Sequence, residues 1–123
     1  MKIIKTNKAP AAIGPYSAGI KINNMIFTSG QIPVNHVDGS MPKDIKEQTR
    51  QAINNIKGIL SEEGYTLNDV VKTTVFIMDM NDFSAINEVY AEMFSEHKPA
   101  RSCVQVAKLP KGASIEIEVI ASK

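Results

Sequence analysis

The sequence predicts an α+β domain in which two helices cover one face of a mixed β-sheet. Two amphipathic stretches, 44–63 and 82–96, carry apolar residues at the helical spacing i, i+3, i+4, i+7, and short β-branched runs precede, separate and follow them. The resulting order is β-β-β-α-β-α-β-β. Because parallel crossover connections are right-handed, two crossovers that step in the same direction leave both helices on one face. The chain of 123 residues suffices for a single domain, 1–123.

Three short strands are expected in the N-terminal third of the chain. Residues 1–8 contain the first, and an irregular loop rich in proline and glycine follows it. The apolar runs Ala18–Ile22 and Met25–Ser29 flank the pair Asn23-Asn24. Asparagine tolerates positive φ better than most residues, so this pair predicts a tight hairpin between the two runs.

The first helix is expected over Asp44–Glu63. Its apolar face is formed by Ile45, Ala52, Ile53, Ile56, Ile59 and Leu60. Asp44 with Glu47 three residues later resembles a capping box, which marks a helix N-terminus. Gly64 is expected to cap the C-terminus.

A central strand is expected over Val70–Asp79, because apolar residues occur on both of its faces. Val71, Val75 and Ile77 share one face, and Val70, Phe76 and Met78 share the other. Two helices on one side leave the second face of the sheet without a cover, so the sequence predicts oligomerisation.

The last part of the chain predicts one helix and two strands. Asn81 or Asp82 is expected to cap the helix, which extends to about Glu96 before Pro99. Two closing strands follow, Ser102–Ala107 and Ser114–Ala121.

Composition and charge exclude several classes of function. The 14 Lys plus Arg nearly balance 13 Asp plus Glu, so nucleic acid is not the expected partner. One cysteine and two histidines do not supply a structural zinc site, and the chain is expected to hold no metal. No apolar run approaches the roughly 18 residues of a membrane span, and no signal-peptide core precedes the first lysines. We therefore expect a cytoplasmic protein without membrane contact.

Few residues stand out as chemical candidates from spacing alone. The strand period of two puts Arg101 on one face with Cys103, and this is the more polar face of its strand. An arginine in this setting is more often part of a surface salt bridge. Glu116 and Glu118 share a face of the last strand, where carboxylates are usually solvated. We interpret both histidines as structural: His36 lies in an expected turn, and His97 lies at the end of an expected helix.

Six separated blocks of sequence narrow these possibilities. They are Ala9–Ser17, Thr28–Pro33, Lys72–Phe76, Asn87–Tyr90, Pro99–Val104 and Ile115–Glu118. In order and spacing, from about residue 9 to 121, they resemble the RidA (reactive intermediate deaminase) family. The block that contains Arg101 resembles that of the subfamily active on imines.

The resemblance implies a chorismate-mutase-like fold, with the last strand inserted between the third and the fourth. It also implies a homotrimer with active-site clefts between subunits. The implied activity is hydrolysis of 2-iminobutanoate and 2-iminopropanoate, with enamine tautomers such as 2-aminoacrylate, to 2-oxo acids and ammonia. Pyridoxal-phosphate dehydratases release these compounds, and the protein itself is expected to need no cofactor.

The same resemblance assigns roles to individual residues. Arg101 would bind the substrate carboxylate, because the planar guanidinium group matches its two oxygens. Glu116, expected to lie near Arg101, would position or activate the attacking water. The remaining pocket residues would be Tyr16, Ser29, Gly30, Asn87 and Cys103.

Two alternatives remain at this point. The first is a non-catalytic trimer that binds small carboxylates or regulates another protein, and turnover with release of ammonia would distinguish it from a deaminase. The second is a ribonuclease or translation inhibitor. The net charge of +1 and the absence of a basic patch with aromatic residues in the sequence make this second alternative weaker.

Overall fold

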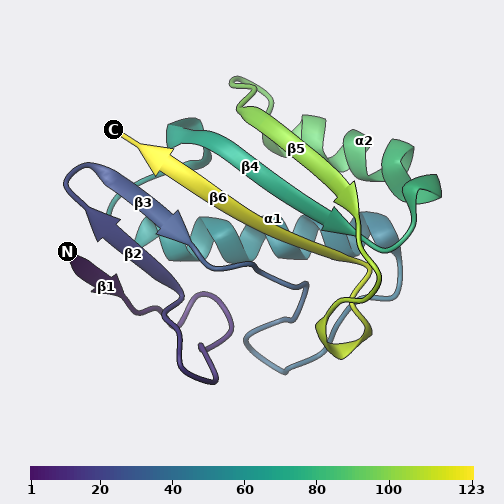
Figure 1. Ribbon diagram of the computed structural model, residues 1–123, viewed down its shortest axis with the longest axis horizontal. Helices are drawn as coiled ribbons and strands as arrows, with labels where there is room; N and C mark the ends of the chain where they lie inside the picture. Colours follow the sequence, from purple (N-terminus) through teal and green to yellow (C-terminus); the bar gives the residue numbers. More distant parts are fainter.

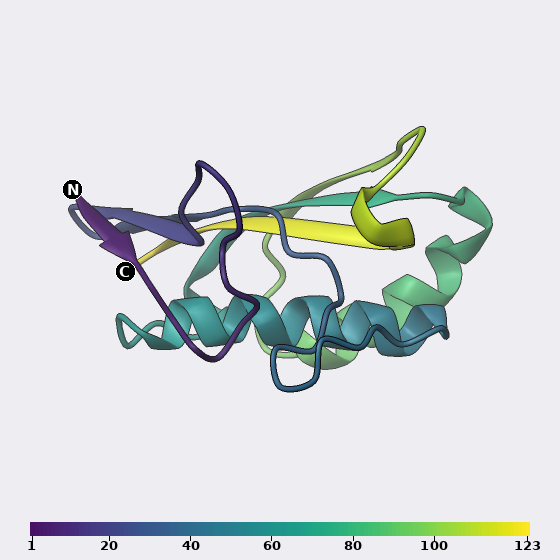
Figure 2. The ribbon, with the colours of Figure 1, turned by 90° about the horizontal axis from the view of Figure 1, so that it is seen from below.

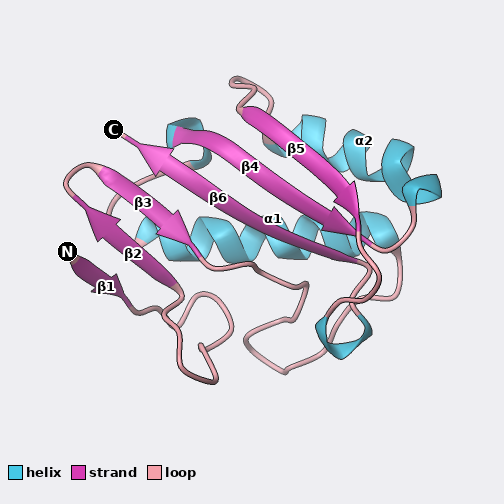
Figure 3. Cartoon of the chain, viewed as in Figure 1, coloured by secondary structure: helices cyan, strands magenta, loops and turns pink.

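A six-stranded sheet forms one layer of the molecule and two helices form the other (Figures 1 and 3). The computed structural model describes all 123 residues. The strands are β1 Lys2–Ile4, β2 Gly19–Ile22, β3 Met25–Thr28, β4 Val70–Ile77, β5 Ala100–Gln105 and β6 Ile115–Ser122, and the helices are α1 Ile45–Ser61 and α2 Phe83–Met93. The order across the sheet is β1-β2-β3-β6-β4-β5, with only β4 and β5 parallel. The predicted element order and the insertion of the last strand are both confirmed.

The two helices lie on the same face of the sheet, as predicted (Figure 2). The core between the layers is a cluster of 20 buried residues, most of them aliphatic. Alternate residues of the central strands, among them Val75 in β4 and Ile117 in β6, meet α1 residues such as Ile56, and all three are fully or almost fully buried. Neither helix is long and apolar enough to cross a membrane.

The ends of α1 confirm the predicted signals. The side chain of Asp44 accepts a hydrogen bond from the backbone N–H of Glu47 at 3.1 Å. At the other end Gly64 adopts a φ of 73°, and the backbone N–H of Tyr65 reaches the carbonyl of Leu60 at 3.1 Å. This is the geometry that a helix C-terminus needs from glycine, because a Cβ disfavours the left-handed conformation.

β4 corrects one detail of the prediction. A register shift lies between Val70 and Lys72, and it turns Val70 toward the helices, where it is fully buried, while Val71 is 44% exposed. The expected faces of these two valines are therefore exchanged. A prediction from the strict alternation of side chains along a strand cannot include such an irregularity, which exchanges the faces of two consecutive residues.

The start and end of α2 also differ from prediction. Asp82 makes no capping hydrogen bond. Instead, Asp79 caps a short 3₁₀ turn, Met80–Asp82, by accepting from Asn81 N–H at 2.9 Å. The helix ends at Met93, before the expected Glu96. The 3₁₀ turn supplies the first turn, so the capping residue lies further upstream than the helical period indicates.

The second face of the sheet has no covering layer within the chain, apart from loops at one end (Figure 2). Cross-strand pairs put Phe27 beside Ile120 and Phe76 beside Val104 on this face. Phe27 is 40% exposed and Val104 46% exposed. The apolar open face agrees with the expectation that a second copy covers it, which stays a prediction.

Gly58 provides a test of the packing between α1 and the N-terminal segment. A Cβ at Gly58 would lie 2.8 Å from the carbonyl carbon of Lys8 and closer still to its oxygen. Alanine normally stabilises a helix interior by about 1 kcal/mol relative to glycine, whereas overpacking against backbone costs about 1–3 kcal/mol. Because the contact is with backbone, which cannot rotate away, the upper end of that cost applies, and we expect Gly58→Ala to lower the free energy of unfolding by about 2 kcal/mol. Denaturant unfolding measures this, with Asn54→Ala at an exposed position of α1 as control; equal or higher stability of Gly58→Ala would contradict the packing described.

Candidate active site

Three loops gather at one end of the sheet, between β1 and β2, after β3, and between β5 and β6 (Figure 3). Ser29 ties the first of them to the end of β3. Its hydroxyl donates to the carbonyl of Ser17 at 2.5 Å, and its backbone N–H donates to Ala18 at 2.9 Å. Tyr16, in the tied loop, is 54% exposed and lines the cavity described below.

Glu116 lies on β6 directly against Gly30. A Cβ at Gly30 would lie 2.7 Å from Glu116 Oε2, so the absence of a side chain makes room for the carboxylate. The strand pair Phe76 and Glu116 places this carboxylate on the open face of the sheet. Burial raises the pKa of Glu116, and the nearby carboxylate of Glu118 raises that pKa further. A half-buried carboxylate with a raised pKa is a better proton acceptor than an ordinary surface glutamate.

Arg101 lies on β5 and is held by α2. Its guanidinium group donates to Asn87 Oδ1 at 2.7 Å and lies over the rings of Tyr90 and Phe83, at 4.8 and 5.3 Å from the centroids. Tyr90 is itself fixed by a 2.8 Å hydrogen bond to Thr73. The sequence placed Arg101 on a polar strand face, but two aromatic rings and an amide surround it instead. Such a cage orients the cation without neutralising it.

Cys103 shares the face of Arg101 and is half-buried. Burial raises the pKa of its thiol, and the positive charge of Arg101 opposes this effect only in part. A thiol with a raised pKa is mainly protonated at neutral pH and is a poor nucleophile.

The candidate residues form two groups within one chain. Arg101 of β5 pairs with Thr73 of β4, whereas Glu116 of β6 pairs with Phe76 of β4. Thr73 and Phe76 are an odd number of positions apart on one regular strand, so they point to opposite faces. Asn87 and Cys103 accompany Arg101 on the helix side, and the open-face group comprises Tyr16, Ser29, Gly30 and Glu116. Within one chain Glu116 and Arg101 are therefore on opposite faces of the sheet, and their expected proximity, in a cleft between subunits, stays a prediction.

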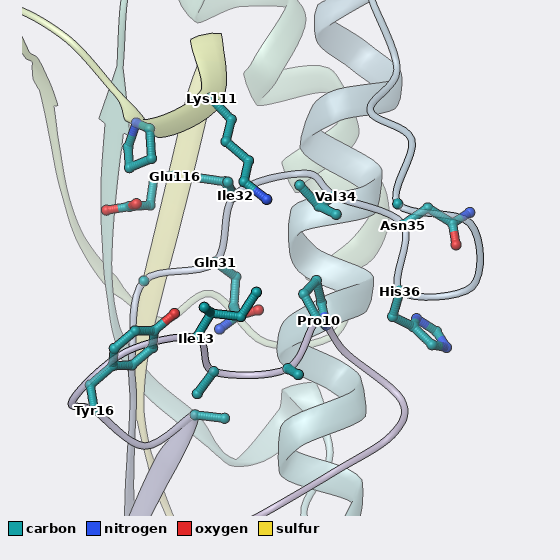
Figure 4. A pocket seen from close by; sticks show the side chains of 16 residues that line it. Pro10, Ile13, Tyr16, Gln31, Ile32, Val34, Asn35, His36, Lys111 and Glu116 are labelled. Carbon is teal, nitrogen blue, oxygen red and sulfur yellow. The ribbon is translucent and has the colours of Figure 1, made fainter.

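A cavity of about 540 Å³ is lined by Glu116, Gly30 and the loop that contains Tyr16; Figure 4 shows the lining side chains. Its lining includes Gln31, which the sequence analysis did not single out, although Gln31 lies inside the block Thr28–Pro33. It also includes His36, which lies in a turn as predicted and is exposed at the rim of the cavity. The ring of His97, in contrast, hydrogen-bonds the carbonyl of Val70, which agrees with a structural role. Three or more His, Cys, Asp or Glu side chains do not come together anywhere in the chain as a metal site would require.

Comparison with known proteins identifies the family. Residues 6–123 match the sequence profile of the family described as Endoribonuclease L-PSP, which is the RidA family. The chain belongs to the RidA family. It is 54% identical to the 2-iminobutanoate/2-iminopropanoate deaminase of Escherichia coli K12, over 98% of this chain and 96% of that protein.

Solved structures of the RidA family have the same fold. Escherichia coli TdcF with bound serine superposes with a TM-score of 0.97 at 51% identity, covering 100% of this chain and 99% of that chain. Yeast Mmf1 superposes with a TM-score of 0.95 at 43% identity, covering 99% and 98%. The shared fold therefore covers nearly the whole of each chain.

Proposed function

We propose that this RidA-family chain hydrolyses reactive 2-imino acids, 2-iminobutanoate and 2-iminopropanoate with their enamine tautomers, to 2-oxo acids and ammonia. The observation that carries the proposal is the half-buried Glu116 carboxylate, with its raised pKa, against the bare backbone of Gly30. The name of the Escherichia coli relative supports the same chemistry.

The reaction needs one anchor and one proton acceptor. Arg101 binds the carboxylate of the substrate through both guanidinium nitrogens, and Asn87 keeps the guanidinium in place. Glu116 takes a proton from a water molecule as its oxygen attacks the carbon of the C=N bond. Glu116 passes this proton to the nitrogen, the new hydroxyl group gives up its own proton to the nitrogen as the C=O bond forms, and the C–N bond breaks to release ammonia and the 2-oxo acid. The other pocket groups are Tyr16, Ser29, Gly30 and Cys103.

The active site is proposed to lie between subunits of a homotrimer. This placement is supported by the separation of the two residue groups: within one chain, Arg101 and Glu116 lie on opposite faces of the sheet. A second copy packed on the open face would bring its own Arg101 to Glu116 and would cover Phe27 and Val104. Three copies is the number that the family resemblance implies.

A coupled assay tests the proposed function. A pyridoxal-phosphate dehydratase acting on threonine generates 2-iminobutanoate in situ, and this is also the cytoplasmic source that we propose. The chain is expected to accelerate the appearance of 2-oxobutanoate and ammonia above the spontaneous rate. A rate equal to that of buffer would refute the proposal and would leave a small-carboxylate-binding trimer as the function.

The family description names an endoribonuclease, which favours RNA cleavage as a second candidate. A net charge of +1 provides little attraction for a phosphate backbone. Incubation of the chain with a labelled RNA is therefore expected to leave the RNA intact. Cleavage that disappears in the Glu116→Gln variant would assign the nuclease activity to this same site.

Cys103→Ala is expected to retain most of the deaminase activity. The thiol has a raised pKa because of burial, and no histidine contacts it to generate a thiolate. The wild-type and Cys103→Ala rates are compared in the coupled assay, and the variant is expected to withstand thiol alkylators. A folded variant that lost more than about a thousandfold would indicate covalent catalysis instead.

The pH profile is expected to fall on the acid side. Glu116 acts as a base only when ionised, so kcat/KM decreases as the pH falls through its pKa, which lies above the usual range for glutamate. Glu118→Gln removes the neighbouring negative charge, lowers the pKa of Glu116 and shifts the acid limb toward lower pH. Rates corrected for spontaneous hydrolysis provide the measurement. If the acid limb moved to higher pH in Glu118→Gln, or if it persisted in Glu116→Gln, the group that titrates would not be Glu116.

A further inference from the structure

The segment 30–34, which follows β3, is largely buried although it belongs to no helix or strand. Figure 4 shows it passing from Gln31 by way of Ile32 to Val34, beside α1. Buried backbone groups need partners inside the chain, because water does not reach them. Gln31 finds one in Ile117, with which it exchanges two backbone hydrogen bonds, of 2.8 and 3.1 Å. The carbonyl of Val34 has no backbone donor, so a side chain must supply one.

Asn55 of α1 supplies that donor. Its amide nitrogen donates to the carbonyls of both Ile32 and Val34, at 3.1 and 3.0 Å, and its amide oxygen accepts from Gln51 at 2.9 Å. Asn55 is only 1% exposed, and one turn away on the helix Ala52 is fully buried. A buried amide is tolerated where its polar atoms are bonded, as they are here. Asn55 therefore holds an irregular segment against the helix.

The segment that Asn55 holds begins at the candidate active site. Gly30 directly precedes Gln31, and Glu116 directly precedes Ile117, so the bridge between Gln31 and Ile117 sets the separation of Gly30 from Glu116. The contact is tight, because a Cβ at Gly30 would lie 2.7 Å from Glu116 Oε2. This bridge is isolated, with no further pairs to continue it. Its geometry therefore depends on what fixes the residues that follow it.

We propose that Asn55 is a positioning residue of the active site, which keeps Gly30 against the Glu116 carboxylate by holding the segment 30–34 on α1. Its effect on turnover rests on the proposed function, whereas its effect on the segment does not. Without the two hydrogen bonds the segment moves away from α1 and water reaches Glu116. The attacking water is then placed less accurately, and misplacement by about 1 Å can lower a rate about 10²-fold.

Two isosteric substitutions on α1 separate this role from helix stability. Asn55→Leu keeps the branched shape and removes both donors. Thr49→Val is the matched control, because Thr49 is fully buried on the same helix but its hydroxyl bonds only the carbonyl of Ile45, within that helix, at 2.8 Å. Gln51→Ala is a second control, which removes the bond to Asn55 and leaves the two bonds to the segment. If Asn55→Leu does not fold, Asn55→Ala replaces it, because the smaller side chain leaves room for a water molecule.

Amide hydrogen exchange, measured by NMR on the full-length protein, reports on the segment without any assay of activity. In the Asn55 variants the N–H groups of Gln31 and Ile117 are expected to exchange at least about tenfold faster relative to amides of β4, the effect of losing one to two buried hydrogen bonds. In Thr49→Val and Gln51→Ala this ratio is expected to stay at its wild-type value. An unchanged ratio in the folded Asn55 variants would overturn the proposal.

The titration of Glu116, followed by carbon NMR of its carboxyl group, gives a second readout. Burial raises the pKa of Glu116, so water that enters beside Gly30 in Asn55→Leu is expected to lower this pKa toward the ordinary value for glutamate. Several titratable or charged groups surround Glu116, and neither Asn55→Leu nor Thr49→Val replaces any of them: Glu118, Lys111, Tyr16, His36 and, in the proposed assembly, Arg101 of a second copy. A pKa equal to that of the wild type in Asn55→Leu would contradict the proposal.

Turnover of 2-iminobutanoate completes the test. Asn55→Leu is expected to lower kcat at least about tenfold and to leave KM within about twofold, because the segment places the water and not the substrate carboxylate. Both control variants are expected to keep the wild-type kcat. Normal kcat in Asn55→Leu would refute the positioning role even if amide exchange were faster. No turnover by the wild type, together with faster exchange and a lower pKa of Glu116 in Asn55→Leu, would remove the deaminase and leave Asn55 as the residue that holds Gly30 against Glu116.

Discussion

Arg101→Ala is expected to lower kcat/KM for 2-iminobutanoate by about 10²- to 10³-fold, the effect of removing one partner from a buried, hydrogen-bonded charge pair. The change should appear mainly as a higher KM, because Arg101 binds the substrate and the transition state equally. Arg101→Lys is expected to have nearly as low a kcat/KM, since the ammonium group of lysine cannot make the bidentate contact with a carboxylate. The measurement is the coupled assay, with circular dichroism to show that each variant is folded.

The position of Arg101 over Tyr90 and Phe83 requires a control for packing. Asn87→Ala leaves the arginine and the rings in place and removes only the 2.7 Å hydrogen bond that orients it. A smaller rise in KM, at unchanged thermal stability, is expected for this variant. Full activity in a folded Arg101→Ala variant would refute carboxylate binding by this residue.

Glu116→Gln is expected to lower kcat by about 10²- to 10⁴-fold, the usual range for loss of a general base. The amide keeps the shape that fits against Gly30, but it cannot accept a proton from water. KM should change little, in contrast to Arg101→Ala. Steady-state kinetics of the two variants, side by side, distinguish anchor from base. If Glu116→Gln turns over like the wild type, backbone groups near Gly30 must place the water.

Co-assembly of these two variants tests where the site lies. If each site takes Arg101 from one copy and Glu116 from another, mixed oligomers regain active sites, about a quarter of the total for random mixing in a closed ring. If each site were built from one chain, mixing would restore nothing. Light scattering on the same samples is expected to give about three times the 13.5 kDa chain mass.

Local signals in the sequence were the most reliable guides to the fold. The α1 cap at Asp44 and the Gly64 terminus follow from contacts within a few residues, and the structure confirms them. The irregularity after Val70 does not follow, because it depends on how β4 pairs with β6 far along the chain. For the same reason, spacing alone could not predict that β6 lies between β3 and β4. That order came from the family resemblance.

The candidate site shows the same division. The strand period correctly placed Arg101 and Cys103 on one face, but it could not show that Tyr90 and Phe83 of α2 surround the guanidinium group. Gln31 was missed because a glutamine after a strand carries no chemical signal of its own. A backbone bridge to Ile117, a residue distant in sequence, turns its side chain inward at the edge of the cavity.

The placement of Arg101 and Glu116 on opposite faces has a consequence for catalysis in dilute solution. A newly made chain would hold two half-sites and no complete one, so its activity would begin only when copies meet. Mass action then links specific activity to protein concentration, with a steep loss on dilution below the assembly constant. Substrate that bridges Arg101 of one copy and Glu116 of the next would oppose that loss, because a ligand bound only by the assembled form stabilises the assembly.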